Sequence, residues 1–433
     1  MKIYFHLPAL TALIALVALI PASLPAQTSQ NLTLQDAERI AIQNHPQIQA
    51  AIHLASAAKS QVTEARSAYY PTVAGSLTGA DAQSNSRIAA GGLNNPIIYD
   101  RYANGVAVSQ LLTDFGRTHE LVKSSDLHAQ AQQENVESSR AGVLLQVDQA
   151  YYGVLKAQSV LTVAEEAVKQ RQLVSDQITE LQKNKLRSGL DVSFANVNLA
   201  QAQLLLIQAQ NDLQSSFARL SAALGYSDQR TFHLTEEPVP APPPANLSDL
   251  IQQALRDRPE LIGERFDVSS AQSYATAERD LKLPTISALG AAGLVPVNEA
   301  PLAPRYAAAA FNVNVPIFNG HLFGALHSEA KARAQAESDY LRDAQNQVVR
   351  DLQTAWLNAN SAFQRLSVTQ QLLDQANKSL DLAQARYNLG LSSIIELSQA
   401  QLNQTQAQIE QASSKYDYEA QTSALNYQLG ALH

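Results

Sequence analysis

Few residues of this chain have the type and spacing that catalysis or metal binding requires. His321 and His327, like His119 and His128, are not spaced as two ligands on one face of a helix. The chain contains no Gly-x-Ser-x-Gly, His-Glu-x-x-His or phosphate-binding glycine motif, and it has no cysteine. Thiolate metal sites, a cysteine nucleophile and disulfides are therefore excluded. We expect neither an enzyme nor a bound cofactor or metal.

The polar candidates that remain lie near two glycines, Gly189 and Gly390. Arg187 precedes the first glycine, where a cation favours the end of a helix. Glu396 is the acidic residue nearest to the second glycine on its C-terminal side, and Gln399 would lie one turn further along the same helix face. Side chains of this kind could select ions or contact a partner protein.

These residues follow two long segments that would have to position them. Proline is absent from residues 117–187 and 321–389. A helix of about 70 residues would be about 105 Å long, a length that requires a coiled-coil or tubular assembly. We expect Gly189 and Gly390 to take the left-handed conformation and end the two helices. Two residues later, Asp191 and Ser392 would cap the returning helices.

The charge balance argues against nucleic acid as a partner. The 433 residues include 31 Lys and Arg against 39 Asp and Glu, a formal net charge of −8, and no basic stripe could neutralise phosphates. Charged residues make up only 16%, below the roughly 25% of an average soluble protein. Hydrophobic residues make up 45% and are mostly Ala, Leu and Val, which favours thin seams between helices over one thick core.

The N-terminal segment has the pattern of a secretory signal. Lys2 precedes an apolar run from Leu7 to Leu19, and small residues follow as far as Ala26. The alternative is a membrane anchor, but the run is short for a span and is broken by proline. Because no apolar stretch of about 18 residues follows, a membrane-crossing mature chain would need a closed β-barrel.

The order of features in the first half of the chain recurs in the second half. Helices predicted on both sides of Pro46 recur around Pro259, and two weakly alternating segments then predict a pair of strands in each half. Collinear matches over about 200 residues indicate a duplication. The predicted organisation is a signal peptide at 1–26, a first repeat at 27–225 with strands at about 72–79 and 102–110, a proline-rich linker at 226–246, and a second repeat at 247–433 with strands at about 285–293 and 305–315.

The arrangement resembles the TolC-type outer-membrane efflux family over nearly all of the predicted mature chain. The resemblance rests on the order of several short motifs. They are Leu32-Thr33-Leu34-Gln35-Asp36-Ala37 with Asn44-His45-Pro46, Leu247-Ser248-Asp249-Leu250 with Arg258-Pro259, and Tyr387-Asn388-Leu389-Gly390-Leu391-Ser392-Ser393. The closing Ala223-Leu224-Gly225 and Gln428-Leu429-Gly430 also match.

The expected fold is mainly α with a small β part, built from a duplicated helix–strand–strand–helix unit. The resemblance implies a homotrimer, with a shared twelve-stranded β-barrel in the outer membrane lipid and a long α-helical barrel reaching into the periplasm. It also implies passive export of small molecules or polypeptides. The partners would be a periplasmic adaptor (membrane fusion) protein and an inner-membrane efflux pump or ABC exporter.

The resemblance implies roles for residues near the two turns. Gln399 stands where members often carry a second acidic residue, and Ser392 and Ala195 stand where some carry charged gate residues, so a less charged gate is implied. Alternatively, the glycines only turn the chain and Glu396 belongs to a solvated helix face. The implied adaptor-contact tip comprises Arg187, Gly189, Asp191, Gly390 and Ser392, and the implied entrance is lined by Tyr387, Glu396 and Gln399.

Two classes of protein fit the long helices. One is an export duct, and the other is a structural coiled-coil stalk or a periplasmic adaptor. The predicted strand pairs discriminate between them, because a stalk does not need strands and an adaptor carries one hairpin flanked by globular β modules. The sequence therefore favours the duct.

Overall fold

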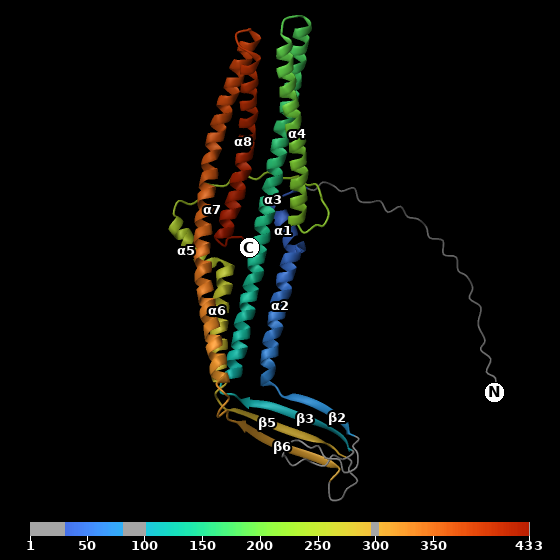
Figure 1. Ribbon diagram of the computed structural model, residues 1–433, viewed down its shortest axis with the longest axis vertical. Helices are drawn as coiled ribbons and strands as arrows, with labels where there is room; N and C mark the ends of the chain where they lie inside the picture. Colours follow the sequence, from blue (N-terminus) through green and yellow to red (C-terminus); the bar gives the residue numbers. More distant parts are fainter. Residues whose placement is uncertain (1–30, 81–100, 296–302, 433) are drawn as a thin grey trace, which may run out of the picture.

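The computed structural model describes residues 31–80, 101–295 and 303–432, so the predicted signal peptide at 1–26 lies outside the described residues. The molecule is mainly helical and elongated, with a sheet at one end (Figure 1). The first repeat contains β1 (Asn31–Leu32), α1 (Leu34–Asn44), α2 (Pro46–Arg66), a 3-10 turn (Ser67–Tyr69), β2 (Thr72–Ala80), β3 (Arg101–Thr113), α3 (Arg117–Lys183) and α4 (Gly189–Ala223). β4 (His233–Leu234) lies in the linker. The second repeat contains α5 (Leu247–Asp257), α6 (Pro259–Asp280), β5 (Thr285–Leu294), β6 (Arg305–Asn314), α7 (Leu322–Asn388) and α8 (Ile394–Gln428).

Proline decides where α2 and α6 begin. His45 and Arg258 precede the two prolines and are extended, each with a ψ of 123°. This is the conformation that the ring of a following proline favours. Pro46 and Pro259 then occupy the first helical position, where the missing N–H removes no helical hydrogen bond.

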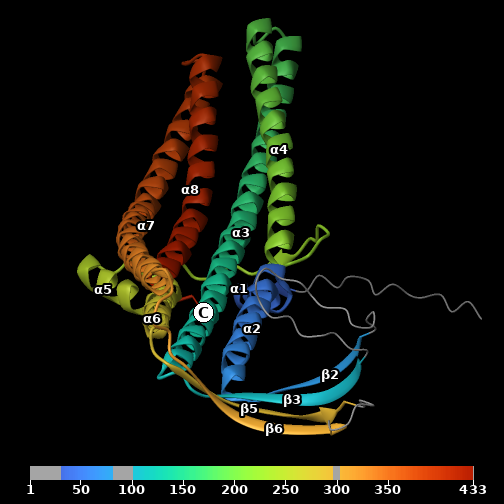
Figure 2. The same cartoon turned by 60° about the horizontal axis from the view of Figure 1, so that its bottom comes forward.

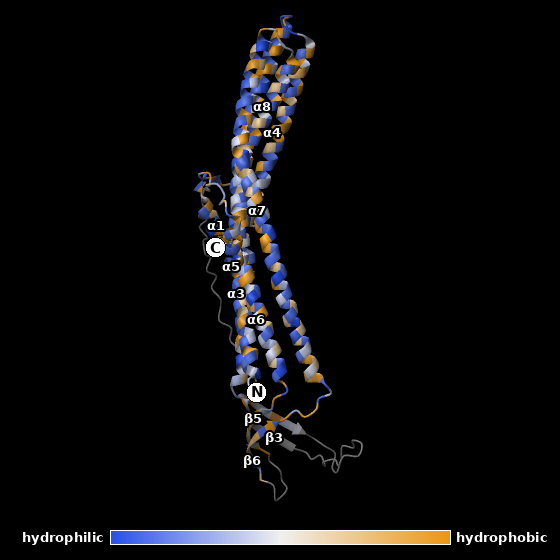
Figure 3. Cartoon of the chain, turned by 90° about the vertical axis from the view of Figure 1, so that its left-hand side faces the viewer, coloured by the Kyte–Doolittle hydropathy of each residue, from blue (hydrophilic) through white to orange (hydrophobic). Residues whose placement is uncertain are grey.

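The two long helices are covered by shorter ones laid end to end. α3 and α7 have 67 residues each and are about 100 Å long. Near the sheet α2 packs along α3 and α6 along α7, and toward the far end α4 and α8 take their places (Figure 1). α3 also contacts α6 and α8, so the two repeats form one helical body. Alanine dominates the buried seams, and apolar and polar residues intermix along all the helices (Figure 3).

α4 is the one described helix whose length and composition would allow it to cross a membrane. In the structure it is instead the returning arm of a hairpin and lies along α3. Its apolar residues Leu204 and Ile207 are 66% and 63% exposed. They give the hairpin an apolar outer stripe that no described element covers.

A single four-stranded antiparallel sheet joins the two repeats. Its order is β2-β3-β5-β6, and β3 of the first repeat pairs with β5 of the second (Figure 2). Apolar side chains such as Leu77 and Phe311 stand on the sheet with 69% and 78% of their surface exposed. β2 and β6 are the edges of the described sheet, and unpaired backbone groups at such edges can pair with another chain.

A buried cluster halfway along the molecule, which we call the belt, surrounds Tyr151 where β1, α1, α3 and α4 meet. The Tyr151 hydroxyl lies 2.9 Å from the carbonyl oxygen of Leu32 and 2.7 Å from that of Thr235. β1 and β4 pair in parallel beside it, with Leu32 opposite Leu234. One hydroxyl thus joins the start of the first repeat to the segment that leads into the second.

Replacing Tyr151 by Phe should therefore lower the free energy of unfolding by about 1–3 kcal/mol, because the Thr235 carbonyl oxygen loses the hydroxyl that lies 2.7 Å from it. Tyr152→Phe is the matched control, since the described contact of Tyr152 is made by its ring, 5.8 Å from the ring of Tyr151. Chemical denaturation of the full chain in detergent would measure the free energy of unfolding of both variants. Equal losses in the two variants would contradict the bridging role of the Tyr151 hydroxyl.

Candidate functional site at the helical tips

The two helical hairpins reach to the end of the molecule that lies opposite the sheet (Figure 1). Each long helix ends there in the same type of turn, in which one residue takes a left-handed conformation. This residue is Lys185, with a φ of 58°, in the first hairpin and Gly390, with a φ of 72°, in the second. The turns are closed by backbone hydrogen bonds from Lys185 to Gln182, Leu186 to Leu181, Gly390 to Tyr387 and Leu391 to Arg386.

The expectation for Gly390 is confirmed, but that for Gly189 is wrong. Gly189 is the first residue of α4 and does not have a positive φ. Because α3 and α7, and likewise α4 and α8, begin at equivalent places, Lys185 is the structural equivalent of Gly390. A left-handed residue other than glycine costs about 1–2 kcal/mol. The exposed position of Lys185 avoids any further cost from packing.

The caps of the returning helices also differ from the expectation. Ser188 caps α4: its Oγ accepts a hydrogen bond from the Asp191 N–H at 3.2 Å, and the Asp191 carboxylate accepts one from the Ser188 N–H at 2.9 Å. Asp191 therefore supports the cap from inside the helix. At α8 the capping position belongs to Ser393, not to Ser392. The Ser392 Oγ is buried without a hydrogen-bond partner among the described residues.

The two tips pack against each other. Tyr387, which was expected to line an entrance, is only 3% exposed and lies between the hairpins of this chain. It belongs to a small apolar cluster that draws residues from all four long segments. The members are Ile178, Ala195, Ala383, Tyr387, Ile394, Leu397 and Ala400.

Arg187 ties the first hairpin to the second. Its Nη2 donates a hydrogen bond to the Tyr387 carbonyl oxygen at 2.7 Å, and its guanidinium carbon lies 4.1 Å from the centre of the Tyr387 ring. Burial raises the pKa of Tyr387, nearby Asp191 raises it further, and the Arg187 cation opposes both. Arg187, expected to contact a partner, is thus engaged inside the chain. Further from the tip, Asn198 donates to the Ser398 hydroxyl at 2.7 Å and adds a second, buried tie.

Glu396 and Gln399 lie on the exposed side of α8, away from the buried seam. Glu396 Oε1 is 3.2 Å from Arg386 Nε, and the Glu396 side chain is 45% exposed. Gln399 donates to the Asn403 side chain at 2.9 Å along the same helix. The Arg386 partner was missed in the sequence, although its place one turn before Gly390 could have indicated it. The pair leaves the second tip less acidic than Glu396 alone would make it.

Exposed leucines surround both turns, and no motif in the sequence marks them as functional residues. Leu389 and Leu391 flank Gly390 and are 73% and 67% exposed, while Leu186 and Leu190 are 69% and 63% exposed in the first tip. Large apolar side chains gathered at the end of a molecule are typical of a contact surface for another protein.

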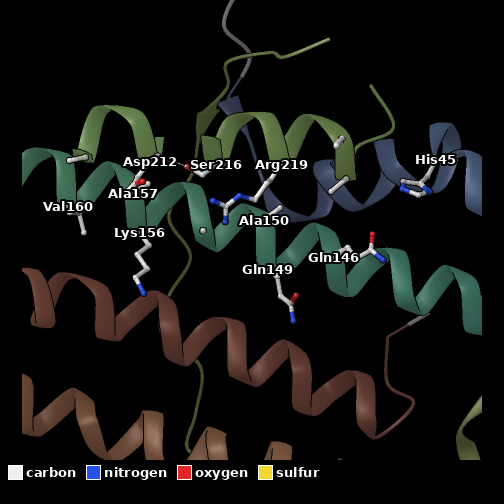
Figure 4. A pocket seen from close by; sticks show the side chains of 14 residues that line it. His45, Gln146, Gln149, Ala150, Lys156, Ala157, Val160, Asp212, Ser216 and Arg219 are labelled. Carbon is white, nitrogen blue, oxygen red and sulfur yellow. Dashed lines mark hydrogen bonds between the residues drawn. The ribbon is translucent and has the colours of Figure 1, made fainter. Parts of the chain in front are cut away.

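A groove of about 760 Å³ lies along α3 and α4 beside the belt (Figure 4). Small residues such as Ala150, Gly153 and Ala157 line part of it, where another helix could pack closely, and polar residues such as Asp212 and Arg219 line the rest. Lys156 points from the groove toward α8, where its ammonium lies 2.7 Å from the Asp417 carboxylate. Among the described residues, no three His, Asp or Glu side chains are grouped so that they could hold a metal ion.

Replacing Arg187 by Ala should loosen the tips. Loss of the hydrogen bond and the cation–π contact removes about 1–2 kcal/mol of local stability, which corresponds to roughly tenfold faster amide exchange. Hydrogen exchange over residues 383–397 would measure the effect. Arg365→Ala, which removes the exposed Arg365–Glu410 pair, is the control and should leave the tip unchanged. Unaltered exchange in the Arg187 variant would show that the tie does not hold the tips.

The chain is similar to known proteins over nearly its whole length. The family model "Outer membrane efflux protein" matches residues 39–226 and 250–431. "Outer membrane protein TolC" of Escherichia coli strain K12 is 23% identical over 90% of this chain and 80% of that protein. "Alkaline protease secretion protein AprF" of Pseudomonas aeruginosa is 23% identical over 93% and 85%.

Solved structures show the same fold. A membrane protein from Pseudomonas aeruginosa, 21% identical, has a TM-score of 0.80 and aligns over 92% of this chain and 93% of its own. The outer membrane protein VceC from Vibrio cholerae, 17% identical, has a TM-score of 0.77 over 92% and 96%. The predicted resemblance is therefore confirmed. This chain belongs to the outer membrane efflux protein family, whose TolC-like members are channels of the outer membrane rather than a class of enzymes.

Proposed function

We propose that this protein is the outer-membrane subunit of a tripartite export system and that it conducts its cargo passively. Three copies would close their sheets into one twelve-stranded barrel and their helices into a tube that extends into the periplasm. The tips would form the entrance. There they would meet a periplasmic adaptor carried by an inner-membrane pump or ABC exporter.

The observation that carries this proposal is the sheet. Its strands have 9 to 13 residues, close to the roughly 9–11 residues that a tilted strand needs to cross a bilayer. Apolar residues stand on its surface, and its two edges are free to pair with the edges of further copies. A closed barrel satisfies every backbone group in lipid, whereas an open sheet does not. A coiled-coil stalk or an adaptor would explain the hairpins but not this sheet.

The helices and strand ends support the same assembly. The groove beside the belt and the apolar stripe of α4 would be covered by helices of the neighbouring copies. Tyr69 and Tyr70 are 48% and 69% exposed at the end of the sheet that adjoins the helices, and Tyr306 is 39% exposed at the other end. Tyrosines at both ends of strands are typical of the two membrane interfaces.

The proposed docking surface is the ring of exposed leucines around the turns, with the turn of Gly390 at its centre. Gly390→Val should leave assembly in the outer membrane intact but reduce export strongly, because a β-branched residue disfavours a φ of 72° and the tip would change shape. Gly189→Val is the matched control, since Gly189 has helical backbone and open space around it. Export or resistance restored in a strain lacking the channel would be compared with the amount of assembled protein.

Full export by the Gly390 variant would show that the tip is not part of the docking surface. Equal loss in both variants would show that any bulk at the first tip interferes, and that the left-handed turn is not the critical feature.

The proposed entrance can be tested through its charge. If Glu396 faces the lumen near the axis of a trimer, its three copies attract cations, and Glu396→Gln should lower the cation preference of single channels in a planar bilayer. Because Arg386 offsets this charge, Arg386→Gln should raise the preference. Reversal potentials under a salt gradient would measure both shifts. Identical values for all three proteins would place the pair on a solvated outer face.

A further inference from the structure

A second polar site lies in the belt, far from the tips. Asp148 on α3 and Glu419 on α8 are each only 2% exposed. Asp148 lies near Glu38 on α1, whose charge acts on it, and near Ser423 on α8. Ser423 lies one helical turn from Glu419, so their side chains share one face of α8. We call Glu38, Asp148 and Glu419 the carboxyl cluster.

The carboxyl cluster has little to compensate its charge. Both carboxylate oxygens of Glu419 and the Oδ1 of Asp148 are buried without a hydrogen-bond partner among the described residues. Lys415 is the cation that acts on Glu419, but its ammonium is already 2.7 Å from Glu236. The remaining titratable groups that act on the cluster or on its tyrosines are acidic or phenolic. They are Asp36 on α1, Tyr151 and Tyr152 on α3, Glu236 and Glu237 after β4, and Tyr416 on α8.

A segment that we call the strap, residues 235–246, passes over this region between β4 and α5. Several side chains of the helices hold it. Thr235 contacts Tyr151, Glu236 accepts hydrogen bonds from Lys415 and Tyr416, and the Tyr418 hydroxyl donates to Ala241. At its far end the Trp356 Nε1 donates to the Pro244 carbonyl oxygen at 2.8 Å. Charge that appears in the carboxyl cluster would act on Glu236 and Glu237 at the start of the strap.

An ionised carboxylate that is buried without a partner is unfavourable, and the group takes up a proton instead. Burial is the main cause that raises the pKa of Asp148 and that of Glu419 to about 7 each. For Asp148 the neighbouring charges of Glu38 and Glu237 add to the effect. Burial also raises the pKa of Glu38. Carboxyl groups of an unfolded chain ionise near pH 4, so the folded belt holds protons that the unfolded chain has released.

We propose that the carboxyl cluster is a proton-binding site and that its occupancy controls how firmly the strap and α1 are held against α3 and α8. When protonated, the site is neutral and the belt is closed. When the protons leave, the charge of Asp148 is repelled by Glu38 and Glu237, and the charge of Glu419 is repelled by Glu236 and Glu237. The strap that carries these last two glutamates then loosens. The site would make the middle of the molecule responsive to pH, independently of whether the tips form an entrance.

The direction follows from proton linkage. A carboxyl group whose pKa is higher in the folded state stabilises that state at acidic pH, and the stabilisation is lost as pH rises through the folded value. The belt should thus be most stable below about pH 4, where both states hold the protons, and weaken up to about pH 7. Most acidic groups stabilised by ion pairs behave in the opposite way.

The chain supplies its own probe, because Trp356 is its only tryptophan and touches the strap. We would record the fluorescence of the full-length protein in detergent from about pH 5 to about pH 9, together with hydrogen exchange of residues 235–246. The wild-type protein should show a red shift and at least about tenfold faster exchange of the strap, with a midpoint near pH 7. The double variant Asp148→Asn/Glu419→Gln should show neither change.

Glu410→Gln, a change of the same type on α8 at a residue paired with Arg365, is the control and should keep the wild-type transition. If the double variant does not assemble, Asp148→Asn alone should still make the transition shallower. A wild-type response that is absent, or that persists unchanged in the variants, would overturn the proposal. Reversal of the alkaline change by added Na⁺ or Mg²⁺ would also overturn it, because it would identify a cation site instead of a proton site.

Discussion

The structure depends on one constraint: a helix of 67 residues cannot bury its own apolar stripe and must be covered along its whole length. The chain meets this constraint by laying two shorter helices end to end on each long one. The arrangement requires a sharp reversal at the far end, which the left-handed residues Lys185 and Gly390 provide. It also requires a junction halfway along, where α2 gives way to α4 and α6 to α8, and the belt is built at this junction.

Two polar sites of the molecule lie where this pattern is interrupted, at the tips and at the belt. Elsewhere along the long helices, alanine is the most frequent buried residue. At the tip, Arg187 and Tyr387 join hairpins that would otherwise meet through a few apolar contacts. At the belt, Asp148 and Glu419 are buried because chain segments from both repeats cross the helices there. The tip site and the belt site therefore lie at opposite ends of the part of the molecule in which α4 and α8 cover the long helices.

Much of the fold could be predicted from the periodicity of apolar residues and from the positions of proline. Missing prolines indicated α3 and α7, Pro46 and Pro259 marked helix starts, and the alternation around Phe311 indicated a strand. The structure differs from the expectation at the first tip because glycine is not the only residue that can turn the chain, and Lys185 does so there. The sequence feature that could have predicted the start of α4 is the capping box formed by Ser188 and Asp191.

The contacts that matter most could not be predicted in this way. Arg187 meets Tyr387, 200 residues further along the chain, only because the two hairpin tips pack against each other. Asp148 comes near Ser423 only because α8 packs against α3. No local sequence pattern indicates which helices pack against each other. Likewise, the residues around Glu419 have no pattern that distinguishes them from a solvated helix face, and the burial of Glu419 becomes evident only in the fold.

The central claim is that the described sheet is one third of a closed barrel and that the tips converge on its axis. Single-particle imaging of the purified protein in lipid nanodiscs tests this most directly. The account predicts three copies, twelve strands closed by pairing of β2 with β6 of a neighbour, and six hairpin tips around one axis at the opposite end. A monomer with an open sheet, or an assembly whose tips point away from one another, would contradict it.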